Sequence, residues 1–148
     1  PSLLPCTNVI KEGNYPIFTG GFSDIWKGQT TDSGSSVCLK VLRIFVNNGV
    51  ENVKEIISKF CREALVWRNV KHPNILPFLG INKEIFAPSF CLISPWMDNG
   101  NIMSFLSHHP RTDCLKSIID VACGMAYLHS LEPPIVHADI QGVSFISS

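Results

Sequence analysis

Apolar and polar residues alternate in the early part of the chain, as they do in β-strands with one buried face. Two runs, IFTGGF and SDIWKGQT, meet near Gly20 and Gly21, and a third run, SVCLKVLRIFV, follows the polar turn TTDSGS. Paired glycines between apolar runs are typical of a hairpin tip, because glycine adopts backbone angles that other residues avoid. Residues 17–46 are therefore predicted to form consecutive strands with a hairpin at Gly20 and Gly21.

The spacing of apolar residues changes after residue 50. At about 100° per residue, one helical stripe holds Val53, Ile56, Ile57, Phe60, Ala64 and Trp67. Glu63 lies roughly 60° from Phe60, at the margin of this stripe. The pattern predicts a helix over 51–70 with a carboxylate beside its buried face. The alternative for Glu63 is a solvated residue at the helix edge.

Short strands and a second long helix are predicted in the rest of the chain. The strands are ILPFLGI (75–81), FCLISPWM (90–97) and the minimal IVH (135–137). The helix is TDCLKSIIDVACGMAYLHS (112–130), and its inner face comprises Leu115, Ile118, Ile119, Ala122 and Met125. Gly124 weakens this helix by about 1 kcal/mol relative to alanine, which favours a close helix contact there. Strands with one inserted helix, then mostly helices, indicate an α+β fold in two lobes that meet near residues 97–100.

Composition and charge exclude several function classes. Apolar residues make up 45% of the 148 residues and charged residues 16%, which is typical of a packed domain and not of a disordered chain. The 12 basic and 12 acidic side chains cancel, so the chain has no electrostatic signature of nucleic-acid binding or of an anionic membrane surface. No apolar run approaches about 18 residues, so membrane insertion is not expected.

The 6 cysteines have no C-x-x-C spacing, which argues against a zinc knuckle or a redox motif. Cys38 and Cys91 lie in apolar, strand-like runs. This is typical of buried free thiols in a reducing compartment, and it predicts a cytoplasmic protein.

Four stretches in a fixed order carry a resemblance to a known family. They are TGGFSDIWKG, VCLK, REALVWRNVKHPNILPFLG and HADIQGVSF, with LISPWMDNGNI between the last two. Any one of them is weak, but their order and spacing together are specific. The chain resembles a eukaryotic-type protein kinase, and is most similar to the tyrosine-kinase-like branch of fungal type. The resemblance implies a protein-kinase-like α+β fold, with a small antiparallel β lobe, one long helix and a hinge at about 10–97, and the start of a helical lobe at 98–148.

The resemblance implies that ATP is the cofactor and that the first hairpin covers its phosphates. Backbone N–H groups approach phosphates most closely where side chains are absent. In the family's register the three glycine places fall on Phe18, Gly20 and Ser23, and the valine place falls on Ile25. Only the middle glycine is kept, and Gly21 adds flexibility at the tip. An ordinary glycine hairpin is the alternative.

Lys40 stands at the place of the lysine that contacts the α- and β-phosphates in the family. A lysine in an apolar strand is costly unless it is paired, and Glu63 is its natural partner. The alternative is a lysine that extends to solvent from a strand edge. Cys38 takes the place of the small alanine that packs on the adenine.

The stretch SPWM resembles the hinge between the kinase lobes. Ser94 stands at the gatekeeper place. Pro95 lacks an N–H but keeps the carbonyl that the family uses for adenine, and Met97 offers both backbone groups. The alternative role of Pro95 is to end the strand.

HADIQGVSF resembles the catalytic loop. Asp139 would orient the substrate hydroxyl and accept its proton, and His137 would hold the loop in place. Ser144 stands where the family has an asparagine that binds Mg²⁺, and its oxygen is a weaker donor on a shorter arm. Ala138 and Gln141 replace two basic residues.

The resemblance implies an ATP-dependent protein kinase that phosphorylates Ser or Thr, in preference to Tyr, of a protein substrate, with Mg²⁺ in the complete domain. The family's main metal-binding aspartate would follow residue 148, so residues 1–148 are predicted to be an incomplete domain that is inactive alone. Such a chain would leave the inner face of the second helix exposed and be prone to association. Two alternatives stay open: an impaired pseudokinase-type module that binds nucleotide or a partner, and an inactive truncated copy.

Overall fold

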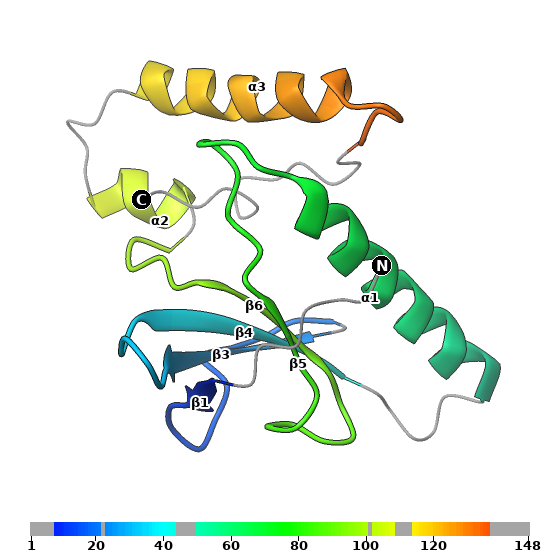
Figure 1. Ribbon diagram of the computed structural model, residues 1–148. Helices are drawn as coiled ribbons and strands as arrows, with labels where there is room; N and C mark the ends of the chain where they lie inside the picture. Colours follow the sequence, from blue (N-terminus) through cyan, green and yellow to red (C-terminus); the bar gives the residue numbers. More distant parts are fainter. Residues whose placement is uncertain (1–7, 22, 44–49, 101, 109–113, 137–148) are drawn as a thin grey trace. The chain divides into compact units, whose positions relative to one another are not determined.

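The computed structural model describes residues 8–21, 23–43, 50–100, 102–108 and 114–136 (Figure 1). The chain divides into two compact units. The first runs to Asn69 and includes Pro77–Trp96, and the second comprises Val70–Leu76 and the chain from Met97 onward. Sheet and helices together confirm the predicted α+β class.

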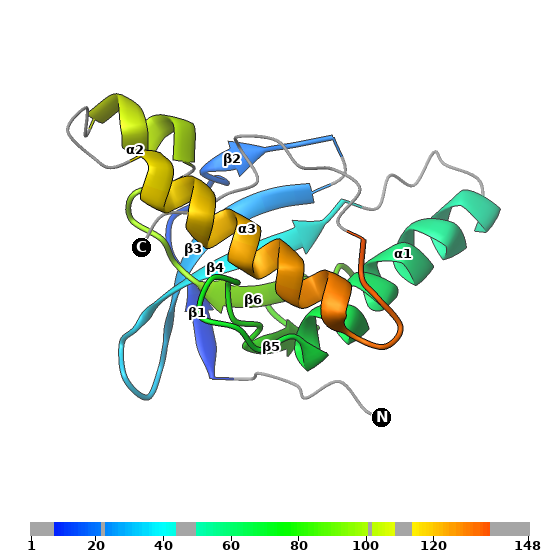
Figure 2. The same ribbon diagram turned by 90° about the horizontal axis from the view of Figure 1, so that it is seen from above.

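The first unit is built on an antiparallel sheet of six strands, whose order is β1-β3-β4-β6-β5, with β2 paired to β3 (Figure 2). The strands are β1 (Val9–Lys11), β2 (Phe18–Thr19), β3 (Ser23–Thr30), β4 (Ser36–Leu42), β5 (Gly80–Asn82) and β6 (Cys91–Pro95). The predicted glycine hairpin is confirmed, because β2 pairs with β3 and the Gly20 N–H donates to the Ser23 carbonyl at 2.9 Å.

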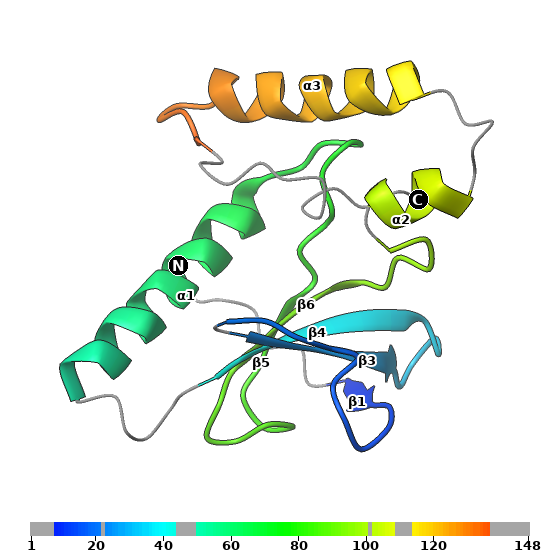
Figure 3. The ribbon, with the colours of Figure 1, turned by 180° about the vertical axis from the view of Figure 1, so that it is seen from behind.

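The alternation of side chains along β4 and β6 builds a core on each face of the sheet. One core consists of Val9, Val37, Leu39, Val41, Cys91 and Ile93, against which Trp26, Ile85 and Phe86 pack. The other consists of Leu42, Phe60, Ala64, Ile81 and Leu92. Phe60 and Ala64 belong to α1 (Val50–Asn69), so this helix covers the second face, beside the sheet in Figure 3. The predicted helix over 51–70 is confirmed within one residue at each end.

β5 is shorter than the strand predicted over 75–81. Its register with β6 begins at Gly80, which is paired with Ile93. Pro77 has no N–H to donate to a ladder, and proline is therefore disfavoured inside a sheet. The strand prediction is wrong for residues 75–79, which are not in the sheet.

In the second unit the segment 70–76 packs against α3 (Cys114–Ser130), which follows α2 (Ile102–His108). A Cβ on Gly124 would lie 3.1 Å from the Asn74 carbonyl oxygen, so the close helix contact predicted at this glycine is confirmed. The ring of His72 stacks on Tyr127 with centroids 4.9 Å apart. The glycine and the tyrosine thus hold the 70–76 segment on one side of the helix.

The apolar face predicted for α3 is largely exposed, as expected for an incomplete domain. Leu115 and Ile118 are each 64% exposed, and Ile119 is 52% exposed. After α3 the chain turns back, because the Ile135 N–H donates to the Leu128 carbonyl at 3.0 Å. Residues 135–136 form no strand, so that prediction is wrong where the structure describes it. No helix in the described ranges is long and apolar enough to span a membrane.

Candidate active site

The sheet register brings several predicted site residues to one face of the first unit. Ile25 lies opposite Lys40, and Cys38 lies opposite Ser94. Cross-strand partners share a face, and so do residues two apart on one strand. Ile25, Cys38, Lys40 and Ser94 therefore face the same side, which is the side that α1 covers.

Lys40 and Glu63 meet on this face. The Lys40 Nζ donates to the Glu63 Oε1 at 2.6 Å. The helix brings the carboxylate there because its neighbours Phe60 and Ala64 are buried in the core. The two side chains are 35% and 44% exposed, so solvent screens the pair and limits its net contribution to stability to about 0.2–1 kcal/mol. The catalytic role of the pair stays a prediction.

Cys38 forms an apolar, partly buried part of the same face. Burial raises the pKa of its thiol above the ordinary value of 9.0, although a hydrogen bond with Ser94 and the charge of Lys40 act in the opposite direction. The thiol is consequently neutral at physiological pH and behaves as a small apolar group. Ser94 is 4% exposed, so the gatekeeper place holds a small, buried side chain opposite Cys38.

The tip between β2 and β3 is tight only at Gly20. A Cβ there would lie 3.2 Å from the Ser23 carbonyl oxygen, whereas a Cβ on Gly21 would have no atom within 4 Å. Phe18, at the first glycine place of the family, is 64% exposed and pairs with Ile25. Side chains at both outer glycine places make this loop bulkier than the family's pattern implies.

The hinge-like residues fall at the boundary of the two units. Pro95 ends β6, as its alternative role required, and its carbonyl oxygen lies 3.5 Å from the Ser94 Oγ. Met97 belongs to the second unit, and its carbonyl accepts a hydrogen bond from the Gly100 N–H at 3.1 Å. The chain therefore turns directly after Met97.

The predicted catalytic loop lies outside the described residues. This applies to His137, Asp139 and Ser144. Within the described ranges no group of three His, Cys, Asp or Glu side chains is placed to hold a metal ion.

One contact on the site's face was missed by the sequence reasoning. The Lys27 Nζ lies 5.4 Å from the centroid of the Trp96 ring, and Lys27 is the cross-strand partner of Cys38. Its position two residues after Ile25 in a strand is a signal that would have placed it on this face. The contact fixes a second ammonium group on the same side of the sheet as Lys40.

Comparisons with known proteins identify the family of the chain. The chain matches the family model described as protein tyrosine and serine/threonine kinase over residues 14–143. It is 30% identical over 132 residues to the probable serine/threonine-protein kinase pats1 of Dictyostelium discoideum, which covers 82% of this chain and 4% of that protein. It is 32% identical over 128 residues to the probable serine/threonine-protein kinase drkB of the same organism, covering 82% and 17%.

A mammalian relative shows the same partial coverage. The serine/threonine-protein kinase TNNI3K of Mus musculus is 30% identical over 129 residues, or 84% of this chain and 14% of that protein. The chain thus spans less than a quarter of the length of these curated relatives. Since the family model covers most of its residues, the chain belongs to the protein tyrosine and serine/threonine kinase family.

Proposed function

We propose that the protein is an ATP-dependent protein kinase that transfers the γ-phosphoryl group of ATP to a Ser or Thr hydroxyl of a protein substrate. The observation that carries this proposal is the 2.6 Å contact between the Lys40 Nζ and the Glu63 Oε1. It joins a strand to a helix on the face that also holds Cys38 and Ser94. Relatives named as serine/threonine-protein kinases support Ser or Thr as the acceptor in preference to Tyr.

The residues on this face fit a nucleoside triphosphate. An ammonium group has three N–H donors, and Lys40 directs one of them to Glu63 while its side chain stays 35% exposed. The remaining donors are available to phosphate oxygens. Ile25 and Cys38 offer apolar surface for a purine, and the carbonyl of Pro95 at the end of β6 offers a polar contact. ATP, when bound, supplies the transferable phosphoryl group.

The catalytic-loop residues complete the proposal. Asp139 would orient the acceptor hydroxyl and take its proton, and His137 would hold the loop in place. Ser144 would hold Mg²⁺ through a single oxygen, which is a weak ligand for a hard cation. The proposed chemistry therefore depends on Lys40 for phosphate charge and on Asp139 for proton transfer.

A second candidate function is nucleotide or partner binding without turnover. The observation in its favour is the bulk of the β2–β3 loop, where Phe18 and Ser23 occupy two of the family's glycine places. Side chains at these places hinder the approach of the backbone to the phosphates. This module would keep the Lys40–Glu63 pair and bind ATP without transferring its phosphoryl group.

We also propose a cytoplasmic location. In the described part of the chain five cysteines form no disulfide: Cys38, Cys61, Cys91, Cys114 and Cys123. Free thiols in this number, two of them exposed, support a reducing compartment.

Nucleotide binding is tested by thermal unfolding of the purified chain with and without Mg·ATP. At 100 times its Kd a ligand stabilises the folded state by about 2.7 kcal/mol. Lys40→Met is expected to abolish this gain. Lys59→Met, which removes an exposed lysine of α1, is the matched control and should keep it. A similar gain in both variants would remove Lys40 from the nucleotide site.

Because residues 1–148 are predicted to be inactive alone, transfer is tested in a longer version that carries the complete kinase domain, with radiolabelled ATP and a mixture of Ser-, Thr- and Tyr-containing peptides. Kinase activity predicts labelled Ser or Thr that is lost in Asp139→Asn. Binding of ATP without any labelling supports the binding module instead. Equal labelling by the parent and by Asp139→Asn would exclude Asp139 as the base.

A further inference from the structure

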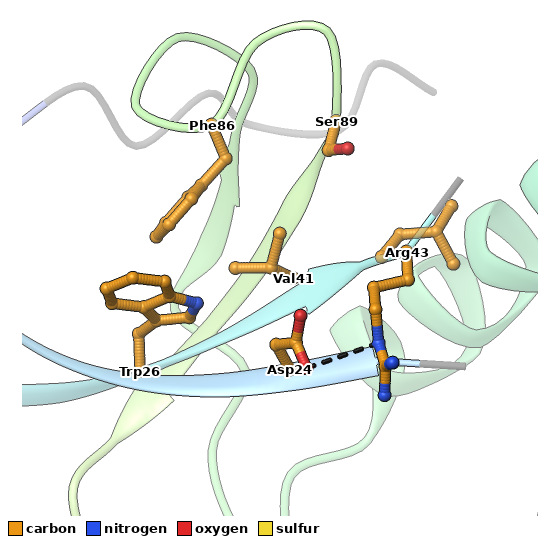
Figure 4. Close-up of a pocket in the computed structure, with 7 residues that line it drawn as sticks. Asp24, Trp26, Val41, Arg43, Phe86 and Ser89 are labelled. Carbon is orange, nitrogen blue, oxygen red and sulfur yellow. Dashed lines mark ion pairs between the residues drawn. The ribbon is translucent and has the colours of Figure 1, made fainter. Parts of the chain in front are cut away.

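A cavity of about 310 Å³ lies on the sheet face opposite to Lys40 (Figure 4). Its lining includes Asp24, Trp26 and Val41, and the register pairs Asp24 with Val41 and Trp26 with Leu39. These residues alternate with Lys40 along the strands, so their side chains leave the sheet on the other side. We call this the outer-face cavity, and it shares no proposed site residue with the nucleotide face.

The outer-face cavity has aromatic walls. Trp26 and Phe86 stand with their ring centroids 5.3 Å apart at an angle of 53°, and Val41 of β4 projects beside them. Phe86 and Ser89 come from the connection between β5 and β6, which folds over the strands. The Asn82 Oδ1 fixes the start of that connection by accepting hydrogen bonds from the Glu84 and Ile85 N–H groups at 2.8 and 2.9 Å. An anchored connection gives the cavity a preformed shape.

The polar groups of the outer-face cavity are mostly donors. Arg43 forms an ion pair with Asp24, with 3.2 Å between Nε and Oδ1, and the Ser89 hydroxyl lies at the rim. The Lys11 Nζ lies over the same aromatic wall, 4.6 Å from the Trp26 centroid. Two cations and one carboxylate leave a net positive charge beside the aromatic surface. Such surroundings favour a ligand that is apolar at one end and anionic at the other.

We propose that the outer-face cavity binds a segment of a partner protein in which a large apolar side chain lies next to carboxylates. The apolar side chain packs between Trp26 and Phe86, and the carboxylates interact with Lys11, Arg43 and the Ser89 hydroxyl. The volume lies at the lower end of the range for ligand pockets, about 300–1,000 Å³, so it accommodates one large side chain. This docking site does not depend on the proposed phosphoryl transfer.

The test uses a fluorescein-labelled peptide, GDFELG, and fluorescence anisotropy with the purified chain. Two matched peptides separate the contributions: GNFQLG lacks the carboxylates and GDAEAG lacks the large apolar side chains. We expect GDFELG to bind and each matched peptide to bind at least tenfold more weakly. Absence of GDFELG binding at millimolar protein, or equal binding of all three peptides, would overturn the proposal.

Two charge reversals locate the site on the protein. Lys11→Glu places a negative charge over the aromatic wall and is expected to weaken GDFELG binding at least tenfold. Lys83→Glu makes the same charge change at an exposed lysine whose Nζ lies over Phe90, in the core on the other face, and is expected to change binding less than twofold. Circular dichroism checks that both variants fold. Equal losses in the two variants, or displacement of the peptide by saturating Mg·ATP, would refute a site on the outer face.

Discussion

Replacing Glu63 by glutamine separates the positioning role of the Lys40–Glu63 pair from its role in stability. The substitution keeps the size of the side chain and removes its charge. Because the two side chains are 35% and 44% exposed, loss of the pair should cost about 0.2–1 kcal/mol of unfolding free energy. For a chain of this size that corresponds to a fall of at most about 4 °C in melting temperature. If Glu63 holds Lys40 in place for the phosphates, kcat/KM for ATP in a version with the complete kinase domain should fall at least tenfold, or about 1.4 kcal/mol of activation free energy.

The control for this substitution lies on the same helix. Glu55 forms an ion pair with Lys59 at 2.8 Å between side chains that are 63% and 74% exposed, and it does not face the sheet site. Glu55→Gln should lower the melting temperature by no more than Glu63→Gln does, and it should leave the rate unchanged. Calorimetry gives the first quantity, and initial rates at several ATP concentrations give the second, with the loss expected mainly as a higher KM for ATP.

Two results would refute this reasoning. If Glu63→Gln lowered the melting temperature and left transfer intact, the pair would serve stability alone. If Glu55→Gln slowed transfer as much as Glu63→Gln, the effect would come from the charge of the helix and not from contact with Lys40.

Three further predictions follow from local geometry. A Cβ on Gly28 would lie 2.6 Å from a β1 carbonyl oxygen, so Gly28→Ala should lower stability by about 1–3 kcal/mol in chemical denaturation, whereas Gly21→Ala, which meets no atom within 4 Å, should be nearly neutral. Because burial raises the pKa of Cys38, iodoacetamide at pH 8 should modify it more slowly than the exposed Cys123, as read by mass spectrometry. The folded chain holds the proton of the Cys38 thiol more tightly than the unfolded chain does. The contribution of this protonated thiol to the free energy of unfolding is therefore complete below pH 9.0 and is lost as pH rises through the folded pKa. Ile118→Glu on the exposed side of α3 should reduce the binding of a hydrophobic dye, and it should reduce self-association in light scattering. Equal association of the parent and the variant would contradict association through the apolar face of this helix.

Most of what could be predicted about the first unit came from the spacing of apolar residues along the sequence. A period of two placed Lys40 in an apolar strand and a period of 3.6 placed Glu63 beside an apolar helix stripe, and the family resemblance then paired the two residues. Both signals depend only on neighbours in the sequence. The same reasoning failed at residues 75–79. Branched side chains suggested a strand there, but Pro77 has no N–H to donate to a strand ladder, and these residues are not in the sheet.

The outer-face cavity could not be predicted in this way. It exists because the connection between β5 and β6 brings Phe86 over Trp26, which is 60 residues earlier in the chain. Nothing local in either stretch specifies that contact, since it depends on the sheet order that places β6 next to β4. The Lys27–Trp96 contact has the same origin in strand order.

The two proposed sites share strands β3 and β4, which has a consequence for their coupling. Leu39 and Val41 support the outer face, and Lys40 between them supports the nucleotide face. Coupling between two ligands requires an element with two arrangements that each ligand favours differently. β4 is instead a central strand with buried neighbours on both faces, bonded to β3 and β6 along most of its length, and a close-packed core of this kind resists small displacements. GDFELG and Mg·ATP should therefore bind independently, each with the same affinity whether or not the other is present. A change of more than about twofold in either affinity that falls short of mutual displacement would mean that β4 moves between two positions, and it would have to appear equally in both directions.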